Sequence, residues 1–367
     1  MALCPTMTSK VPSLDAGNKS FRSSRRFSST PIPGKRPSHM NMVTGDQRCR
    51  LRRNRYDGLA VRCAQTQIQT AENGMIPYVS KPKQKVIAGT DAPPIVILPG
   101  FGNNTTDYTE PFGDKSRALA SQLEERGWRV FTVDLERKDW FKVARALATP
   151  AFWRCKCTAH QGYRWYLDRV HAKVQEAKAS AGCDVVDLVG HSAGGWLARA
   201  YVADPKYFPE ASTASKVERN PAVRSLVSLG APHLAPPKGV PGVFDATRGA
   251  LRWLNEEYPG AFFDDVNYVT VAGRAVVGKE EQRVEGEKQK RSLRQYAYSS
   301  YQQVCGAGEV DGDCVVPKDW ALLEGANQIV LDGVFHSMSK IGTYDEAGEV
   351  QWYGSSDVVD IWLEKLV

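Results

Sequence analysis

Short apolar runs alternate with longer amphipathic segments from about residue 94 to the end of the chain. The first run, residues 95–98, is rich in β-branched side chains and lies between two prolines, which is typical of a buried parallel strand. Further strands are predicted at residues 128–135, 184–189, 223–229, 266–271 and 328–331. Helical spacing of apolar residues predicts helices at residues 116–126, around 166–174, and at 196–202, 247–257 and 358–366. The alternation predicts an α/β fold, with a mostly parallel central sheet flanked by helices in one domain over residues 93–367.

The first 63 residues lack this pattern. They contain eight serines within the first 40 positions, and thirteen Lys and Arg against three Asp. Their net charge of +10 exceeds the +7 of the whole chain, so the other 304 residues carry a net charge of −3. Such a segment cannot bury a core and is expected to be disordered. Because the basic character is confined to it, a nucleic-acid partner is not expected.

Residues 1–63 have the composition of an organelle transit peptide, because they are rich in Ser and Arg and poor in acidic residues. They also lack the continuous apolar stretch of a secretory signal. The opening Met1-Ala2 and the residues around Cys63 resemble the start and the processing site of chloroplast transit peptides. We therefore predict cleavage near Cys63 and a chloroplast location. A basic tail that stays attached and a mitochondrial address remain as alternatives.

Three further segments fall outside the alternation of strands and helices. Residues 64–92 are polar and predict a linker, and residues 279–294 are a dense run of charges that predicts a solvated insertion. Residues 137–160 mix aromatic and basic side chains in an irregular stretch, which makes them a candidate cap or lid. No apolar stretch is long enough for a spanning helix, so any membrane contact is expected to be peripheral.

The eight cysteines follow no zinc-binding spacing, and we expect no metal or cofactor. Cleavage near Cys63 would leave five of them, an odd number that implies no disulfide framework. Cys305 and Cys314 flank an acidic loop and could pair under oxidising conditions, but buried thiols are the favoured interpretation.

The pattern Gly190-x-Ser192-x-Gly194 follows a buried-type strand without a spacer and opens a helix. This is the strand-turn-helix setting of a nucleophile elbow, in which the glycines avoid clashes that a side chain would cause. Ser192 would then project from the carboxyl end of the sheet, where open α/β folds place their sites. The alternative is a glycine-rich turn in which Ser192 only caps the helix.

A serine nucleophile needs a base to take its proton and a third group to orient that base. Elimination among the six histidines favours His336, which follows the last predicted strand and matches the chain order serine, acid, histidine. His233, after an inner strand, is the alternative base. The other histidines lie in the N-terminal segment, before the serine, or beside it with the ring expected to point away: His39, His160, His171 and His191.

For the acid, we favour Asp313, which lies in the segment 310–317 and 23 residues before His336. Two valines and a proline follow Asp313 and could fix its carboxylate against the sheet. Asp311 is the nearby alternative, and an exposed acidic turn is the non-functional one. Acyl-bond hydrolysis also needs donors for the developing oxyanion. The candidate donors are the backbone amides of Ala193, directly after the serine, and of Phe101, between two glycines after the first strand.

These residues, in this order, resemble the α/β-hydrolase superfamily over residues 94–366. Four segments look like those of microbial lipases and of plant plastid hydrolases of the lipase-like or GPI inositol-deacylase-like type: residues 98–102, 190–195, 229–233 and 313–317. The resemblance implies a triad of Ser192, Asp313 and His336 and activity on carboxylic esters, without a metal. Two departures leave the substrate open: Ala193 stands where many lipases have a bulkier residue, and the insertion between residues 271 and 311 is long.

The leading hypothesis is a plastid serine esterase or lipase that acts on a small-molecule or lipid ester with a hydrophobic acyl or prenyl group. An acyltransferase with the same triad, in which an alcohol replaces water, is a second hypothesis. A third is a non-catalytic relative that binds a ligand or scaffolds a complex. The aromatic and basic residues of segment 138–153 suit a lid that touches an anionic lipid surface, and equally the buried side of a cap helix.

Overall fold

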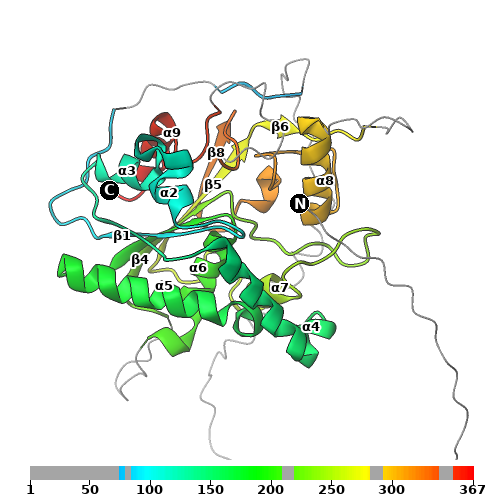
Figure 1. The fold of residues 1–367 in the computed structure, drawn as a ribbon, viewed down its shortest axis with the longest axis horizontal. Helices are drawn as coiled ribbons and strands as arrows, with labels where there is room; N and C mark the ends of the chain where they lie inside the picture. The colour runs from blue at the N-terminus through cyan, green and yellow to red at the C-terminus, as the bar shows by residue number, and fades with distance from the viewer. Residues whose placement is uncertain (1–73, 79–83, 209–218, 282–291, 339–349) are drawn as a thin grey trace, which may run out of the picture. The chain divides into compact units, whose positions relative to one another are not determined.

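The apolar runs form a central sheet of parallel strands in the computed structural model, in the order β2-β1-β3-β4-β5-β8. This sheet confirms the predicted α/β class (Figure 1). Its strands are β1 (Ile95–Leu98), β2 (Val130–Thr132), β3 (Val186–His191), β4 (Val223–Leu229), β5 (Asn267–Arg274) and β8 (Asn327–Asp332).

The structure describes residues 74–78, 84–208, 219–281, 292–338 and 350–367. The predicted transit peptide 1–63, its cleavage position near Cys63 and most of the charged run 279–294 lie outside the described residues. Within the described ranges, no helix has the length and apolar character needed to cross a membrane.

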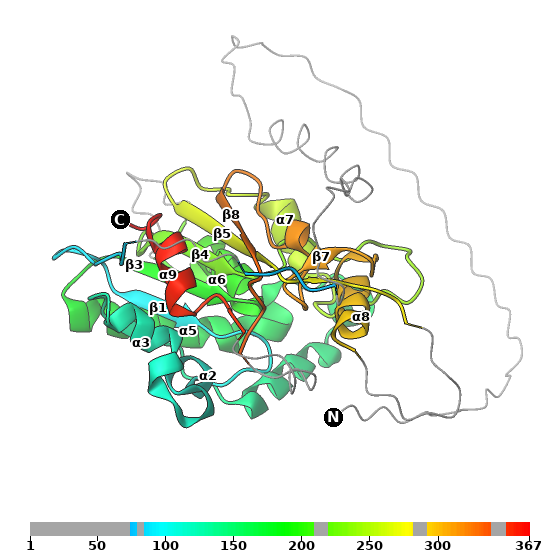
Figure 2. The ribbon, with the colours of Figure 1, turned by 90° about the horizontal axis from the view of Figure 1, so that it is seen from above.

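Helices cover both faces of the sheet. Figure 1 shows α3 and α9 on one side and α5, α6 and α7 on the other, and in Figure 2 α9 crosses in front of the strands. The α-helices are α2 (Thr106–Thr109), α3 (Leu119–Glu124), α4 (Pro150–Trp153), α5 (Ala159–Ala181), α6 (Ala193–Ala203), α7 (Ala250–Glu257), α8 (Leu293–Cys305) and α9 (Ser356–Leu363). The 3-10 helices are η1 (Pro111–Gly113), η2 (Lys115–Arg117), η3 (Arg137–Ala148), η4 (Pro205–Tyr207) and η5 (Lys318–Trp320).

Strand β1 illustrates why a continuous apolar run suits this position. All four of its residues are fully buried, because successive side chains enter different cores. Ile95 and Ile97 pack in the core that contains residues of α3 and α9. Val96 and Leu98 pack in the core that contains residues of α5 and α6. Helices on both faces of a strand therefore favour apolar residues at successive positions.

The long helix α5 is delimited by residues whose chemistry suits each end. Thr158 accepts a hydrogen bond from the amide of His160, and the side chain of Gln161 accepts one from the amide of Thr158 at 2.7 Å. This reciprocal capping satisfies amides that the first turn leaves without helical partners. Gly182 ends the helix with a φ of 63°, a conformation that glycine adopts without strain.

Several elements differ from the sequence-based expectations. The helix predicted at 116–126 covers only Leu119–Glu124, because Asp114 caps a separate turn, η2, and Ala118 is extended. The strand predicted at 128–135 is limited to Val130–Thr132. Helix α8 was not predicted, nor was the small antiparallel pair formed by β6 (Val276–Val277) and β7 (Asp311–Gly312). Figure 2 shows α8 and β7 beside one another.

The polar segment before β1 packs against the domain in its described parts. Ile76 is buried, and its amide donates to the carbonyl of Ala275 at 2.8 Å. Val86 and Ala88 are partly buried against the core beneath α3 and α9. The described residues of the segment predicted as a linker therefore contribute to the fold.

A buried ion pair joins three distant parts of the chain. Arg126, which is 1% exposed and follows α3, contacts both carboxylate oxygens of Asp360 on α9, at 2.6 and 2.7 Å. The same carboxylate accepts the amide of Val86 at 2.9 Å. Burial disfavours ionisation of Asp360, but the hydrogen bonds from Arg126 and Val86 prevail and lower its pKa. The contribution to stability is therefore present above the pKa of an unfolded Asp and is lost as the pH falls through the lowered folded value.

We predict that Asp360→Asn lowers the free energy of unfolding by about 3–5 kcal/mol, because it leaves the buried Arg126 without its counter-charge. Urea denaturation at neutral pH measures the change. Glu125→Gln is the matched control, since its pair with Lys85 is about half exposed and should contribute less than about 1 kcal/mol. Equal effects of the two substitutions would contradict the prediction.

Candidate active site

The turn between β3 and α6 places Ser192 at the carboxyl end of the sheet. Ser192 has φ 51° and ψ −125°, a strained conformation for a residue with a side chain. Its amide donates to the carbonyl of Leu229 at 2.9 Å. A Cβ on Gly194 would lie 2.2 Å from the carbonyl oxygen of Leu98, and one on Gly190 would lie 2.6 Å from the backbone of Gly194. Both positions therefore require glycine, and Ser192 itself remains partly exposed.

A carboxylate from the loop after β7 meets the predicted histidine. His336 Nδ1 lies 2.7 Å from Asp313 Oδ2, and the His336 amide donates to the Asp313 carbonyl at 2.8 Å. The other carboxylate oxygen, Oδ1, accepts the amides of Val315 and Val316 at 2.9 and 2.7 Å. The hydroxyl of Tyr353 donates to Oδ2 at 2.7 Å. Asp313 is fully buried, and these donors replace the water that burial removes.

The alternative acid occupies a different environment. Asp311 lies 3.9 Å from Arg274 and 3.7 Å from Lys318, within ion-pair distance of both. The bond to His336 is made by Asp313, two residues further on.

The alternative base, His233, is fully buried. Neither of its ring nitrogens has a hydrogen-bond partner among the described residues. Burial, aided by the charge of Arg199, lowers its pKa well below the usual range, so the ring is neutral. Its backbone supports the neighbouring loops, because its amide donates to the carbonyl of Trp320 at 2.8 Å. The structure therefore joins the acid to His336 and gives His233 no orienting group.

A buried chain of hydrogen bonds links the loop after β1 to His336. The Tyr108 hydroxyl accepts the amide of Gly100 at 2.9 Å and lies 2.7 Å from His191 Nδ1. On the other side of the ring, His191 Nε2 lies 2.8 Å from the carbonyl oxygen of His336. A carbonyl can only accept, so Nε2 carries the proton and Nδ1 accepts from Tyr108. Burial, with the nearby His336 ring, lowers the pKa of His191 to about 3.

The loop after β1 also holds the candidate oxyanion donor Phe101. A Cβ on Gly100 would lie 2.8 Å from Ser192 Cβ, so this loop passes directly beside the serine. Tyr166 fixes the loop from the other face by donating to the carbonyl of Pro99 at 2.8 Å. In the part of the chain that the structure describes, the amides of Phe101 and Ala193 donate to no other group. Both are therefore available to a ligand at Ser192.

The described residues make no hydrogen bond between Ser192 and His336. Both residues instead flank His191, which precedes the serine in the chain and whose ring centre lies 4.7 Å from that of His336. Nucleophile–base hydrogen bonds are often long in ligand-free sites and shorten when substrate binds.

The site residues that sequence reasoning missed are Tyr108, His191 and Tyr353. His191 was set aside as the base because its ring was expected to point away from the serine, and that ring bonds both Tyr108 and the backbone of His336. The described ranges contain no group of three His, Cys, Asp or Glu side chains suited to a metal ion. Cys305 and Cys314 are buried thiols there.

Comparison with known proteins places this geometry in context. The family described as "Alpha/beta hydrolase family" matches residues 95–322. The Bacillus licheniformis lipase BlEst2 in mature form is similar with 15% identity and a TM-score of 0.40, over 70% of this chain and 89% of that one. EstA from Clostridium botulinum is similar with 12% identity and a TM-score of 0.41, over 84% and 96% of the two chains. A search of curated proteins finds no match.

We predict that His191 makes the fold less stable in acid. The unfolded ring binds a proton near its ordinary pKa of about 6.5, whereas the folded ring does so only at about 3, so stability falls as the pH drops between these values. At pH 5 this one group should cost about 2 kcal/mol relative to pH 8. Urea denaturation at both pH values measures it, and His191→Gln should remove that part of the difference. An unchanged difference in the variant would contradict the assignment of a neutral ring.

Proposed function

The chain belongs to the alpha/beta hydrolase family, and from this premise we propose that it is a serine hydrolase that cleaves carboxylic esters through Ser192, His336 and Asp313. The observation that carries the proposal is the bond of 2.7 Å between His336 Nδ1 and the buried carboxylate of Asp313, formed beside the strained turn at Ser192. A histidine oriented in this way near a partly exposed serine is the arrangement that activates a hydroxyl nucleophile.

In the proposed reaction, His336 Nε2 takes the proton of Ser192 Oγ as that oxygen attacks the ester carbonyl carbon. Asp313 stabilises the imidazolium that forms, and His336 then returns the proton to the departing alcohol as the ester C–O bond breaks. Water, deprotonated by the same ring, attacks the acyl-enzyme and releases the acid together with free Ser192. The Asp313 carboxylate suits this role, because four hydrogen-bond donors hold it in one orientation.

The negative charge of the tetrahedral intermediate needs donors that are already in place. We assign that role to the amides of Phe101 and Ala193. Ala193 is the first residue of α6, so its amide is one of the free donors at a helix N-terminus. The Phe101 amide is positioned by its neighbour Gly100, whose amide is held by the Tyr108 hydroxyl.

For the substrate, we propose an ester with a hydrophobic acyl or prenyl group, such as a glycerolipid or a pigment ester. The support is local: the Phe101 side chain is 61% exposed next to the proposed oxyanion amide, and its ring centre lies 5.0 Å from that of Trp140. Apolar groups at a site entrance favour apolar ligands. The Ser- and Arg-rich segment 1–63 supports the further proposal of a chloroplast location.

We expect a fluorophosphonate probe to label the wild-type protein covalently and to leave Ser192→Ala unlabelled, because the probe reacts with an activated serine hydroxyl. Ser180→Ala, an exposed serine on α5, is the matched control and should label like the wild type. The measurement is in-gel fluorescence, followed by hydrolysis assays on lipid and pigment esters. An unlabelled wild type, or equal labelling of Ser192→Ala, would show that the protein is not a serine hydrolase of this kind. A protein that is labelled by the probe, and that transfers the acyl group to an alcohol but not to water, would be an acyltransferase.

Tyr108→Phe should lower kcat about tenfold and leave KM nearly unchanged. The substitution removes the hydroxyl that holds the Gly100 amide and His191 Nδ1, and one such hydrogen bond contributes about 1–1.5 kcal/mol. Without this hydroxyl, the oxyanion donor and the base are positioned less precisely, and both act mainly in the transition state. Steady-state kinetics on a soluble ester measures both constants, with thermal unfolding as the control for folding. A loss that appears only in KM would contradict this role for Tyr108.

A further inference from the structure

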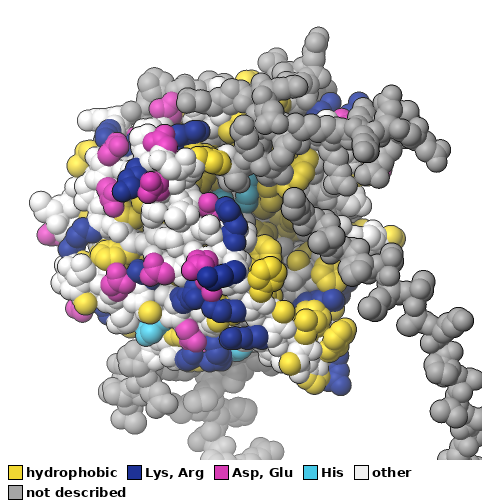
Figure 3. Space-filling view, viewed as in Figure 1, with side chains coloured by type: hydrophobic (Ala, Val, Ile, Leu, Met, Phe, Trp, Pro, Cys, Tyr) yellow, Lys and Arg dark blue, Asp and Glu magenta, His cyan; other side chains and the backbone are white. Residues whose placement is uncertain are grey.

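Exposed aromatic and aliphatic side chains gather on η3, α4 and the loops beside them. Phe141 is 81% exposed, Trp153 70% and Leu147 44%, and Phe101 and Phe244 are also more than half exposed. We call these five residues the aromatic platform. Figure 3 shows hydrophobic side chains on this face over the region of α4. Soluble proteins seldom leave large aromatic side chains clustered in water without a binding role.

Contacts between the platform residues and their neighbours hold this surface together. The Phe101 ring contacts Trp140, which directly precedes Phe141 in η3. Trp153 Nε1 donates to the carbonyl of Leu147 at 3.0 Å. The guanidinium of Arg248 lies 4.1 Å from the ring centre of Phe244 and 4.4 Å from that of Phe152, the neighbour of Trp153. The platform is therefore assembled from three separate segments of the chain.

Basic side chains lie beside the platform. Residues 137–156 contain six Lys and Arg and a single acidic residue, Asp139, which is buried. Arg145, Arg154 and Lys156 are exposed in this stretch. In Figure 3 a row of Lys and Arg side chains borders the hydrophobic ones. Aromatic side chains flanked by cations match the interface of an anionic bilayer, in which apolar groups enter below the headgroups and cations remain among the phosphates.

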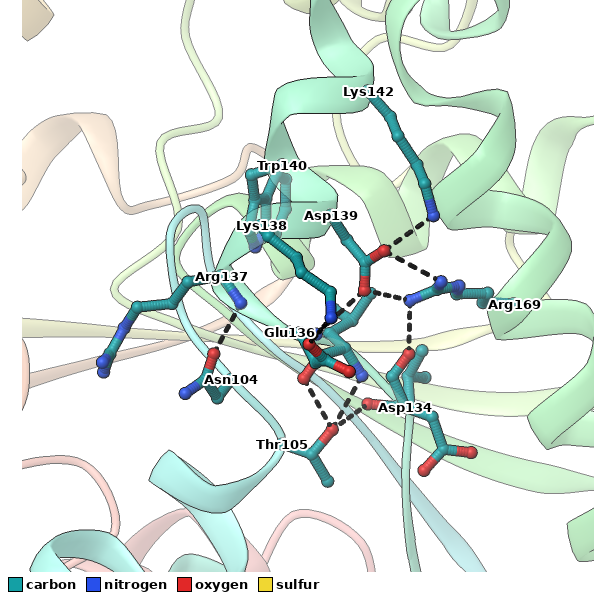
Figure 4. Close-up of polar contacts among 12 residues, drawn as sticks. Asn104, Thr105, Asp134, Glu136, Arg137, Lys138, Asp139, Trp140, Lys142 and Arg169 are labelled. Atoms are coloured by element: carbon teal, nitrogen blue, oxygen red, sulfur yellow. Dashed lines mark hydrogen bonds and ion pairs between the residues drawn. The ribbon is translucent and has the colours of Figure 1, made fainter.

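The segment under the platform is anchored to the domain. Figure 4 shows Asp139 between Lys142 and Arg169, with oxygen–nitrogen distances of 2.6 Å to each. Hydrogen bonds from Arg169 are the main reason that the pKa of Asp139 is lowered, so the carboxylate is ionised at neutral pH. Trp140 is buried beneath, and its ring nitrogen donates to the carbonyl of Asn103 at 3.2 Å. These bonds fasten η3 to α5 and to the loop after β1.

We infer that the aromatic platform, with the basic side chains around it, docks the protein onto an anionic lipid bilayer. Docking through it would place the entrance at Phe101, beside Ser192, against the membrane, so that a lipid ester could enter the site without crossing water. The delivery of an ester rests on the proposed hydrolase function, whereas the docking itself does not. Because η3 is anchored, the surface needs no closed-to-open movement before it binds.

The test compares full-length variants by sedimentation with phosphatidylcholine vesicles that contain or lack phosphatidylglycerol. The apolar variant is Phe141→Ser with Trp153→Ser, and the charge variant is Arg145→Gln with Arg154→Gln and Lys156→Gln. The matched control combines Lys85→Gln, Ile87→Ser and Lys365→Gln. These three residues are exposed and lie towards the amino ends of the strands. Ile87 directly precedes Ala88, whose amide donates to the carbonyl of Arg126 shortly before β2. The carbonyl of Lys365 accepts a hydrogen bond from Asn267 at the start of β5. The basic segment 1–63 is present in every protein and contributes equally.

We expect the wild type and the control to bind the anionic vesicles alike. Three lost cations should weaken that binding by up to about 100-fold, since each contributes about 1 kcal/mol near an anionic surface. The apolar variant should bind at least about tenfold more weakly. Brominated lipid should quench the tryptophan fluorescence of the wild type more than that of Trp153→Phe, because Trp153 enters the bilayer. Quenching that is equal in these two proteins, or equal vesicle binding by all variants, would overturn the inference.

Fluorophosphonate labelling in lipid-free buffer separates this inference from the proposed function. Both platform variants should label at the wild-type rate, because none of their substituted residues belongs to the proposed catalytic machinery. An unlabelled wild type that still binds vesicles through the platform would overturn the hydrolase and support the docking surface. Normal labelling, together with vesicle binding that is unchanged in every variant, would support the hydrolase and overturn the docking surface.

Discussion

The first turn of α6 approaches the end of β1 so closely that a side chain on Gly194 would begin 2.2 Å from the carbonyl oxygen of Leu98. This contact brings the helix onto the sheet and leaves Ser192 with a positive φ at the tip of the turn. Since parallel strands end at one edge, the loops after β1 and β8 meet around that serine. The positions of the Phe101 amide and of His336 relative to Ser192 thus all depend on a backbone approach that only glycine permits.

Hydrogen bonds satisfy both of the buried polar side chains beside the site. Two amides, a hydroxyl and an imidazole surround the carboxyl group of Asp313. His191 gives up its charge, because a tyrosine hydroxyl on one side and a carbonyl on the other suit only the neutral ring. Each solution also fixes geometry: the carboxylate orients His336, and the neutral ring ties the backbone of His336 to the loop that carries Phe101. The hydrogen bonds that satisfy these two side chains therefore also fix the positions of the groups around them.

The sequence was sufficient for the parts of the structure that local patterns encode. Residues 95–98 form β1 with the predicted bounds, because an unbroken apolar run suits a strand that is buried on both faces. Helix α8 was not predicted, because its buried residues Ala297, Tyr301 and Cys305 lie among polar residues directly after a run of charges. Tyr108 and Tyr353 could not be predicted, because their bonds to His191 and Asp313 span 83 and 40 residues and leave no local signal. The choice of His336 depended on chain order, and the two valines and the proline after Asp313 favoured that residue over Asp311.

Tyr353 has a consequence for the order in which the site comes into being. It follows the serine, the acid and the histidine in the chain, and its hydroxyl serves both the Asp313 carboxylate and, at 2.7 Å, the amide of Gly273. A nascent chain that has emerged only as far as His336 holds every residue of the proposed triad, yet Asp313 still lacks one of its donors. Completion of the site therefore coincides with the docking of the segment that leads into α9. During synthesis, the Asp313 carboxylate therefore gains its last hydrogen-bond donor only when most of the surrounding domain is available to fold.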